Sequence, residues 1–184
     1  MCGNIRGMSG HSKWHNIKRK KEITDAKRSK EFSKVSRLIT VAARSGGGDP
    51  DANPALRLAV QKAKDARMPK DNIDKAIKKG IGNSAGSDYQ EAIYEGYGPF
   101  GGAVLVYCLT DNKNRTVSDV RSIFSRAGGS LGTAGSTSYI FTEQDKTPTY
   151  YTALREDQKE KVTGFLESLD DHDDVQEIYS NYSL

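Results

Sequence analysis

The first half of the chain has the apolar spacing of amphipathic helices. Phe32, Val35 and Ile39 recur at intervals of three and four residues, which places them on one side of a helix. The pattern predicts a helix from about residue 24 to residue 44. Gly46–Gly48 follows it and is expected to end it, because glycine is a poor helix former and suits helix ends.

Two shorter helices are predicted after this one. Asn53 is a favourable N-cap and Pro54 suits the first turn, so the second helix begins here. The pair Met68–Pro69 breaks this helix and starts a third, which ends at Gly80. Three amphipathic helices joined by short connections predict a small three-helix bundle.

Beyond Ser87 the apolar pattern becomes that of strands separated by helices. Strands are expected at residues 92–97, 103–110, 136–142, 149–153 and 175–179, and helices at 114–126 and 156–169. This order predicts an α+β sandwich with helices on one face of a mostly antiparallel sheet. The expected fold class is therefore α+β and multidomain, with an N-terminal three-helix bundle followed by this sandwich.

Composition and charge divide the chain at the same place. Residues 82–87 are Gly, Asn, Ser and Ala, which is the composition of a linker. Residues 1–87 carry 20 Lys and Arg against 8 Asp and Glu, a net charge of +12, whereas residues 88–184 carry 8 and 16, a net charge of −8. We expect a flexible lead at 1–10, a basic helical domain at 11–81, the linker at 82–87 and an acidic α+β domain at 88–184.

The composition also narrows the classes of function. No apolar run approaches the roughly 20 residues that span a bilayer, and the start of the chain lacks the apolar core of a secretory signal. Cys2 and Cys108 are far apart in the sequence and support neither a disulfide framework nor a zinc site. No catalytic constellation stands out. We expect a monomeric cytoplasmic protein with no membrane association, no metal, no cofactor and no enzymatic activity.

The N-terminal segment carries the main functional signal. Residues 11–37 hold ten Lys and Arg against three acids, whereas an ordinary solvated helix would interleave acids at helical spacing. Such a density of cations suits the neutralisation of phosphates, with release of condensed counterions. The candidate nucleic-acid-binding residues of this segment are Lys13, Trp14, Lys18, Arg19, Lys20, Lys21, Lys27, Arg28, Lys30, Lys34 and Arg37.

Four other features can be interpreted either as functional sites or as ordinary structural elements. Trp14 could stack on a splayed base, or it could hold the N-terminal arm on the bundle. Gly96–Gly101 matches G-x-G-x-x-G but precedes a predicted strand, so it is interpreted as a turn. Gly128–Gly135 lacks the Lys-Ser/Thr of a P-loop, although its amides could serve a phosphate or a partner. Asp170–Asp174 is interpreted as an acidic turn, because it lacks the glycine and distal Glu of a calcium loop.

Seven short motifs occur in the order Gly10–Trp14, Asp25–Arg28, Gly46–Pro50, Asn53–Pro54, Tyr94–Pro99, Thr110–Thr116 and Asp173–Gln176. Together they resemble the YebC/PmpR family over almost all of residues 8–181. The resemblance implies a cytoplasmic protein whose helical bundle is the main nucleic-acid contact. It also suggests a second contact at residues 112–116, where Lys113 and Arg115 are the only clustered bases of the acidic half.

The chain departs from the family pattern in one respect. Members usually carry a third small α+β domain inserted within the second. Here residues 139–142 pass through Glu143–Lys146 directly to residues 147–149, which leaves no room for an insert. The second domain is therefore expected to be continuous.

Family members have been described as DNA-binding transcriptional regulators and have also been linked to translation at stalled ribosomes. The basic run here lacks a recognition helix with Asn, Gln and Arg poised to read base edges. This favours recognition of the backbone and shape of structured RNA. We expect a translation factor that binds ribosomal RNA on the ribosome and relieves stalled translation. The alternative is a transcriptional regulator that binds promoter DNA, and an enzyme that uses the glycine-rich loops ranks last.

Overall fold

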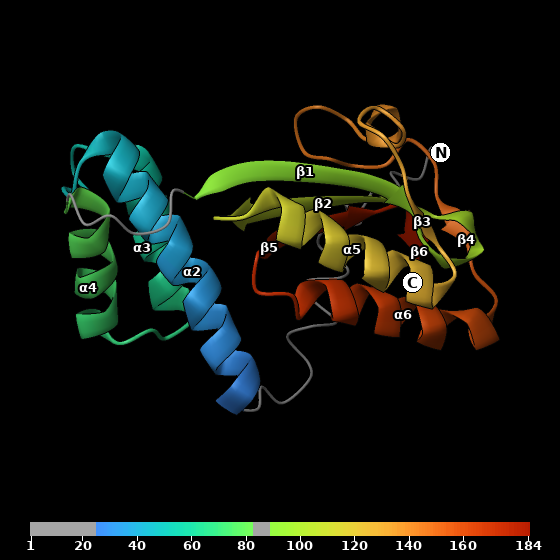
Figure 1. Cartoon of the computed structure of the whole chain (residues 1–184), viewed down its shortest axis with the longest axis horizontal. Coiled ribbons are helices and arrows are strands. Elements are labelled where there is room, and N and C mark those ends of the chain that lie inside the picture. Colours follow the sequence, from blue (N-terminus) through green and yellow to red (C-terminus); the bar gives the residue numbers. More distant parts are fainter. Residues whose placement is uncertain (1–24, 83–88) are drawn as a thin grey trace, which may run out of the picture.

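The computed structural model describes residues 25–82 and 89–184, and its first part is a three-helix bundle (Figure 1). The long helix α2 (Asp25–Gly46) packs against both α3 (Pro54–Asp65) and α4 (Lys70–Ile81). The bundle has its own small core, which consists of Val35, Ile39, Ala42, Ala43, Leu56, Ala59, Ala63, Met68, Ile73 and Ala76. The predicted bundle is confirmed, with helix ends within about two residues of those expected.

Asn53 shows how the sequence fixes the connection between α2 and α3. Its side-chain oxygen accepts a hydrogen bond from the backbone N–H of Leu56 at 3.1 Å, as an N-cap does. Its side-chain nitrogen donates to the carbonyl oxygens of Ala42 at 2.7 Å and Gly47 at 2.9 Å. One buried side chain therefore starts α3 and also satisfies carbonyl groups at the end of α2.

The second part is built on a four-stranded antiparallel sheet. Its strands are β1 (Gln90–Tyr97), β2 (Ala103–Thr110), β3 (Ser130–Leu131) and β5 (Val175–Ser180), in the order β3-β1-β2-β5. Two short strands, β4 (Thr152–Ala153) and β6 (Tyr182–Ser183), pair in parallel beside it. The mostly antiparallel α+β fold predicted from the sequence is confirmed.

The sheet is covered on both faces. Helices α5 (Lys113–Ala127) and α6 (Glu156–Asp170) lie on one face (Figure 1), where Val104 and Val106 of β2 pack with Phe124 and Phe165. On the other face Ala103 and Leu105 pack with Ile140 and Phe141. Alternate residues of β2 enter opposite layers, which explains why this strand is an almost continuous apolar run.

The predicted strand at residues 136–142 is wrong. The 3-10 turn η2 (Ser138–Ile140) occupies this region, and only an isolated bridge joins Phe141 to Pro148. The cause is Glu95 of β1, whose buried carboxylate accepts hydrogen bonds from the backbone N–H groups of Gly135, Thr137 and Ser138, each at 2.8 Å. These amides are thereby unavailable to a neighbouring strand.

Several expectations fall on residues outside the described ranges. They are the flexible lead at 1–10, most of the linker at 82–87, and the candidate residues Lys13, Trp14, Lys18, Arg19, Lys20 and Lys21. In the described part of the chain, no helix is long and apolar enough to cross a lipid bilayer.

Candidate nucleic-acid interface

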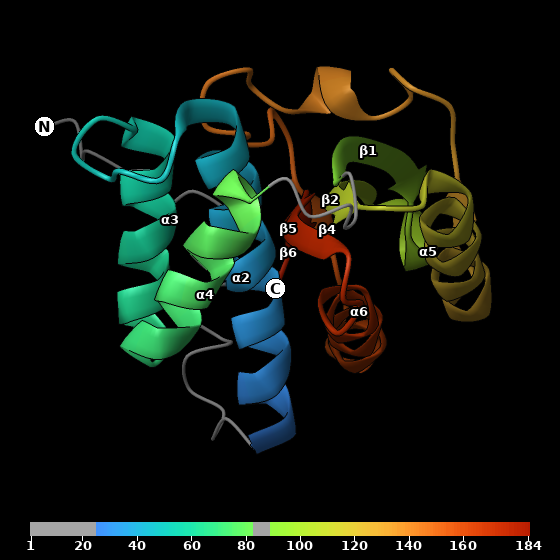
Figure 2. The same ribbon diagram turned by 60° about the vertical axis from the view of Figure 1, so that its left-hand side comes forward.

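The candidate cations of α2 fall into two groups. Lys27 and Arg28 are exposed near the start of the helix. Lys30, Lys34 and Arg37 follow at intervals of four and three residues and therefore share one face. That face is turned to the segment between α6 and β5, which Figure 2 shows beside the lower half of α2. The structure thus places three side chains that were predicted to bind nucleic acid against the predicted acidic turn.

The contacts between α2 and this turn are charged. Lys30 donates to the carbonyl oxygen of Asp171 at 3.1 Å and lies 3.9 Å from its carboxylate. Lys34 donates to the carbonyl oxygen of Asp170 and to its carboxylate, the latter at 3.3 Å. Arg37 donates to the carbonyl oxygen of Asp173 at 2.7 Å.

Asp174 is the centre of this contact. Its side chain is only 2% exposed and pairs with Arg37 at 2.5 Å and with Arg115 at 2.8 Å. The hydroxyls of Thr110 and Thr116 lie 3.0 and 2.7 Å from the same carboxylate. Burial by itself would raise the pKa of Asp174, but the hydrogen bonds from Arg115, Thr116 and Thr110 and the charge of Arg37 lower it to about 2. The carboxylate therefore stays ionised and joins α2 to the α+β part.

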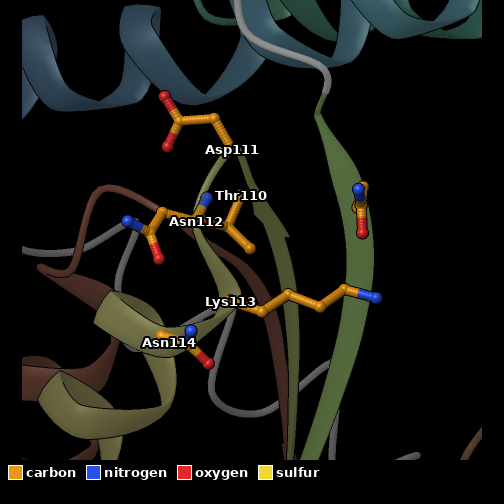
Figure 3. A pocket seen from close by; sticks show the side chains of 6 residues that line it. Thr110, Asp111, Asn112, Lys113 and Asn114 are labelled. Carbon is orange, nitrogen blue, oxygen red and sulfur yellow. Dashed lines mark hydrogen bonds between the residues drawn. The ribbon is translucent and has the colours of Figure 1, made fainter.

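The second candidate contact lies at the start of α5. Asn112 caps this helix by accepting from the backbone N–H of Arg115 at 3.1 Å. Arg115 is 48% exposed but is held by Asp174 and, at 2.9 Å, by Asp111. Lys113 is exposed and extends toward β1 (Figure 3). An open pocket of about 240 Å³ is found here, lined by Gln90, Thr110, Asp111, Asn112, Lys113 and Asn114.

Helices α3 and α4 carry further exposed cations that form no run in the sequence. Lys64, Arg67, Lys70, Lys75 and Lys78 are all exposed. Within residues 25–82 and 89–184, none of these five forms an ion pair. Arg67 has a positive φ of 59° in the tight connection between the two helices, which brings Lys64 and Lys70 to the same end of the bundle. The signal was present in the sequence, because these residues occupy the polar positions between the apolar ones.

The glycine-rich Gly128–Gly135 run does not offer a set of open amides. Its last residue, Gly135, donates to Glu95, as do Thr137 and Ser138 just beyond it. Burial would raise the pKa of Glu95, but these backbone hydrogen bonds lower it below its ordinary value. The intramolecular carboxylate therefore takes the place that a phosphate would need. Among the described residues, no group of three or more His, Cys, Asp or Glu side chains could hold a metal ion.

Comparison with known proteins agrees with this architecture. The TACO1/YebC protein N-terminal domain matches residues 12–83, and the TACO1/YebC second and third domain matches residues 89–146. The probable transcriptional regulatory protein BDU_30 of Borrelia duttonii is 44% identical over 238 aligned positions, which cover 96% of this chain and 98% of the relative. A probable transcriptional regulatory protein of Persephonella marina is 58% identical over 137 residues, which cover 74% of this chain and 55% of the relative.

A solved structure has the same fold. The crystal structure of a conserved hypothetical protein, Aq1575 from Aquifex aeolicus, superposes with a TM-score of 0.77 at 33% sequence identity, covering 86% of this chain and 91% of that chain. These findings define a two-part protein in which a cationic helical bundle precedes an α+β sandwich. The chain belongs to the TACO1/YebC family.

The chain is shorter than the relatives that it matches, which agrees with the expectation that the inserted third domain is missing. The 238 aligned positions exceed the 184 residues present here, so a stretch of the relative has no counterpart. Over the shorter and more identical matches, the chain spans about half the length of the relatives, 55% in Persephonella marina. The backbone N–H of Thr142 donates to the carbonyl of Thr147 at 2.9 Å. The chain therefore makes a tight turn at the point where an inserted domain would begin.

Proposed function

We propose that this chain is a non-catalytic nucleic-acid-binding regulator of gene expression that acts in the cytoplasm. Within this proposal, its target is structured RNA on the ribosome, where it relieves stalled translation. Binding promoter DNA is the second candidate, and it is favoured by the names of the relatives, which are probable transcriptional regulatory proteins.

The observation that carries the proposal is the distribution of positive charge over the helical bundle. Residues 1–87 have a net charge of +12, and the exposed Lys64, Arg67 and Lys70 have no carboxylate partner within the described residues. Cations without an acidic partner are available to neutralise phosphates, and the release of the counterions condensed on the nucleic acid drives that binding. We therefore include the α3–α4 cations in the proposed contact, beside Lys27 and the basic residues before α2.

We propose RNA rather than DNA as the target for a physical reason. Cations that contact phosphates position a protein on a nucleic acid but carry no sequence information. The exposed side chains near the α3–α4 connection include Lys64, Arg67 and Lys70, which suit contacts to a folded phosphate backbone. Specific DNA binders typically prefer their sites by ~10³ or more over other sequences, which needs base-edge contacts.

Two binding experiments separate these candidates. The purified protein should sediment with ribosomes, and nuclease treatment of the RNA should release it. On duplex DNA it should prefer a candidate promoter over a shuffled sequence by much less than ~10³. A preference of that size for one promoter, without ribosome association, would instead support the transcriptional candidate.

A matched pair of variants tests the proposed surface. Lys64→Gln/Lys70→Gln removes two cations from the bundle, whereas Arg121→Gln/Arg126→Gln removes two exposed cations from α5. If about six phosphates are neutralised, the slope of log K against log salt is about −4 on single strands. The bundle variant should reduce the size of that slope by about 1.4, and the α5 variant should leave it unchanged. Equal effects of the two variants would show that only net charge matters.

A further inference from the structure

The two parts of the molecule are held together by charged and polar contacts. Besides the pairs between α2 and residues 170–174, Lys62 of α3 pairs with Glu177 of β5 at 3.1 Å, and Arg37 and Lys79 lie over the ring of Tyr89. In the described part of the chain, none of the three hydrophobic clusters includes residues of both parts. Such a contact is weakened by salt and by competing ions more readily than an apolar one.

The turn presents its oxygens to α2 as a polyanion would. Lys30, Lys34 and Arg37 form a row along one face of the helix, and each receives a carbonyl oxygen together with a carboxylate from the turn. A nucleic-acid strand also offers successive anionic oxygens to a row of cations. The same row of cations can therefore bind either the acidic turn or a nucleic-acid strand.

We propose that Lys30 and Lys34 form a nucleic-acid-binding surface that the acidic turn at residues 170–174 occupies in this structure, and that a phosphate backbone displaces Asp170 and Asp171 from it. This inference rests on the proposed function, because it describes how that binding is regulated. The turn acts as an internal competitor, so the affinity for nucleic acid is lower than the cations of α2 alone would give.

Displacement begins at the Lys30 end of the row. The side chains of Lys30 and Asp171 are 45% and 47% exposed, so ions reach this pair from solvent. At the other end Asp174 is buried and is also held by Arg115, Thr110 and Thr116 of its own domain. Arg37 therefore remains on Asp174 and serves as the fixed point, while the contacts of Lys30 and Lys34 exchange carboxylate for phosphate.

The test uses the full chain and a fluorescein-labelled single-stranded RNA of twelve nucleotides, titrated at two salt concentrations. Asp170→Asn/Asp171→Asn weakens the competitor and should bind the RNA about fivefold more tightly than the wild type. Glu156→Gln/Glu160→Gln makes the same change in net charge at the far end of α6, where both carboxylates are exposed. It should change the affinity less than twofold.

The decisive step combines these changes with the loss of a cation. Lys30→Gln should weaken RNA binding more in the Asp170→Asn/Asp171→Asn background than in the wild type, because only there is its ammonium group without a competing carboxylate. Lys34→Gln should behave alike, provided that its thermal unfolding matches that of the wild type. Equal effects in both backgrounds, or an equal gain in RNA affinity from the Glu156/Glu160 control, would contradict the proposed competition. A wild-type protein that binds no nucleic acid would remove the proposed function itself.

Discussion

Arg37 on α2 and Asp174 before β5 form an ion pair of 2.5 Å, although they are separated by 137 positions in the sequence. Because the pKa of Asp174 falls from the ordinary 3.8 to about 2 in the folded protein, ionisation of this group stabilises the fold. The stabilisation is complete above about pH 5 and is lost as the pH falls through 4 toward 2. A lowering of this size corresponds to about 2 kcal/mol of unfolding free energy.

The first prediction therefore concerns Asp174→Asn. At pH 7 the variant should be less stable than the wild type by about 2 kcal/mol or more, because two guanidinium groups lose their carboxylate. The difference should shrink near pH 3, where the wild-type group begins to protonate. Urea unfolding at both pH values measures it. Asp157→Asn, which alters an exposed pair with Arg155, should cost less than about 0.5 kcal/mol. A pH-independent difference for Asp174→Asn would contradict the assignment.

The second prediction concerns Glu95, whose side chain organises the 132–138 segment. In Glu95→Gln the new amide group presents its own N–H toward backbone donors, so at least one N–H of Gly135, Thr137 or Ser138 loses its acceptor. Such a loss costs about 1–3 kcal/mol. Hydrogen exchange at these three amides should become faster. Glu91→Gln on the same strand is the control, because Glu91 is exposed, and slow exchange in both variants would refute the role of Glu95.

The third prediction concerns the proposed domain boundary. We propose that the chain divides at residues 82–87, because this segment is rich in Gly and Ser and the hydrophobic clusters on its two sides share no residue. Brief digestion with a broad-specificity protease should release an acidic fragment that begins near residue 88, identified by mass spectrometry. The two fragments should remain associated at low salt and separate at 1 M salt. A cut within residues 103–110 that leaves the linker whole would contradict this boundary.

The elements that follow local rules could be predicted from the sequence. Asn53 and Pro54 mark the start of α3 by capping chemistry, and the run at residues 103–110 coincides with β2. The strand expected at residues 136–142 does not form, because backbone N–H groups of this segment donate to Glu95, which lies some forty positions earlier. Local periodicity carries no information about such a contact.

The candidate site illustrates the same difference. The sequence shows that α2 is basic and that residues 170–174 are acidic, but not that the two segments meet. Lys34 and Asp170 are 136 positions apart, and their pairing depends on how the bundle sits against the sheet. The cations of α3 and α4 are hard to recognise for a different reason, since they are spread through helices and form no run in the sequence. Their positions between apolar residues indicate exposure, but only the fold shows that Lys64 and Lys70 lie at the same end of the bundle.

The last prediction tests the packing of the bundle that carries the proposed surface. Gly80 of α4 lies against α2 so closely that a Cβ atom would be 2.5 Å from the carbonyl oxygen of Thr40 and 2.7 Å from the Cβ of Ala43. Gly164, in the interior of α6, has open space at the same position. Alanine is favoured over glycine in a helix by about 1 kcal/mol, so Gly164→Ala should raise the unfolding free energy by up to that amount.

Gly80→Ala has the same intrinsic gain, but α2 and α4 must move apart to accept the new methyl group. Overpacking of this kind costs about 1–3 kcal/mol, and here the obstacle is backbone, which cannot rotate away. We expect a net loss of stability, together with weaker binding of RNA, because Lys75 and Lys78 lie on the helix that is displaced. Thermal unfolding and the RNA titration measure the two effects. Stabilisation by Gly80→Ala equal to that by Gly164→Ala would show that the two helices are not in close contact at this point.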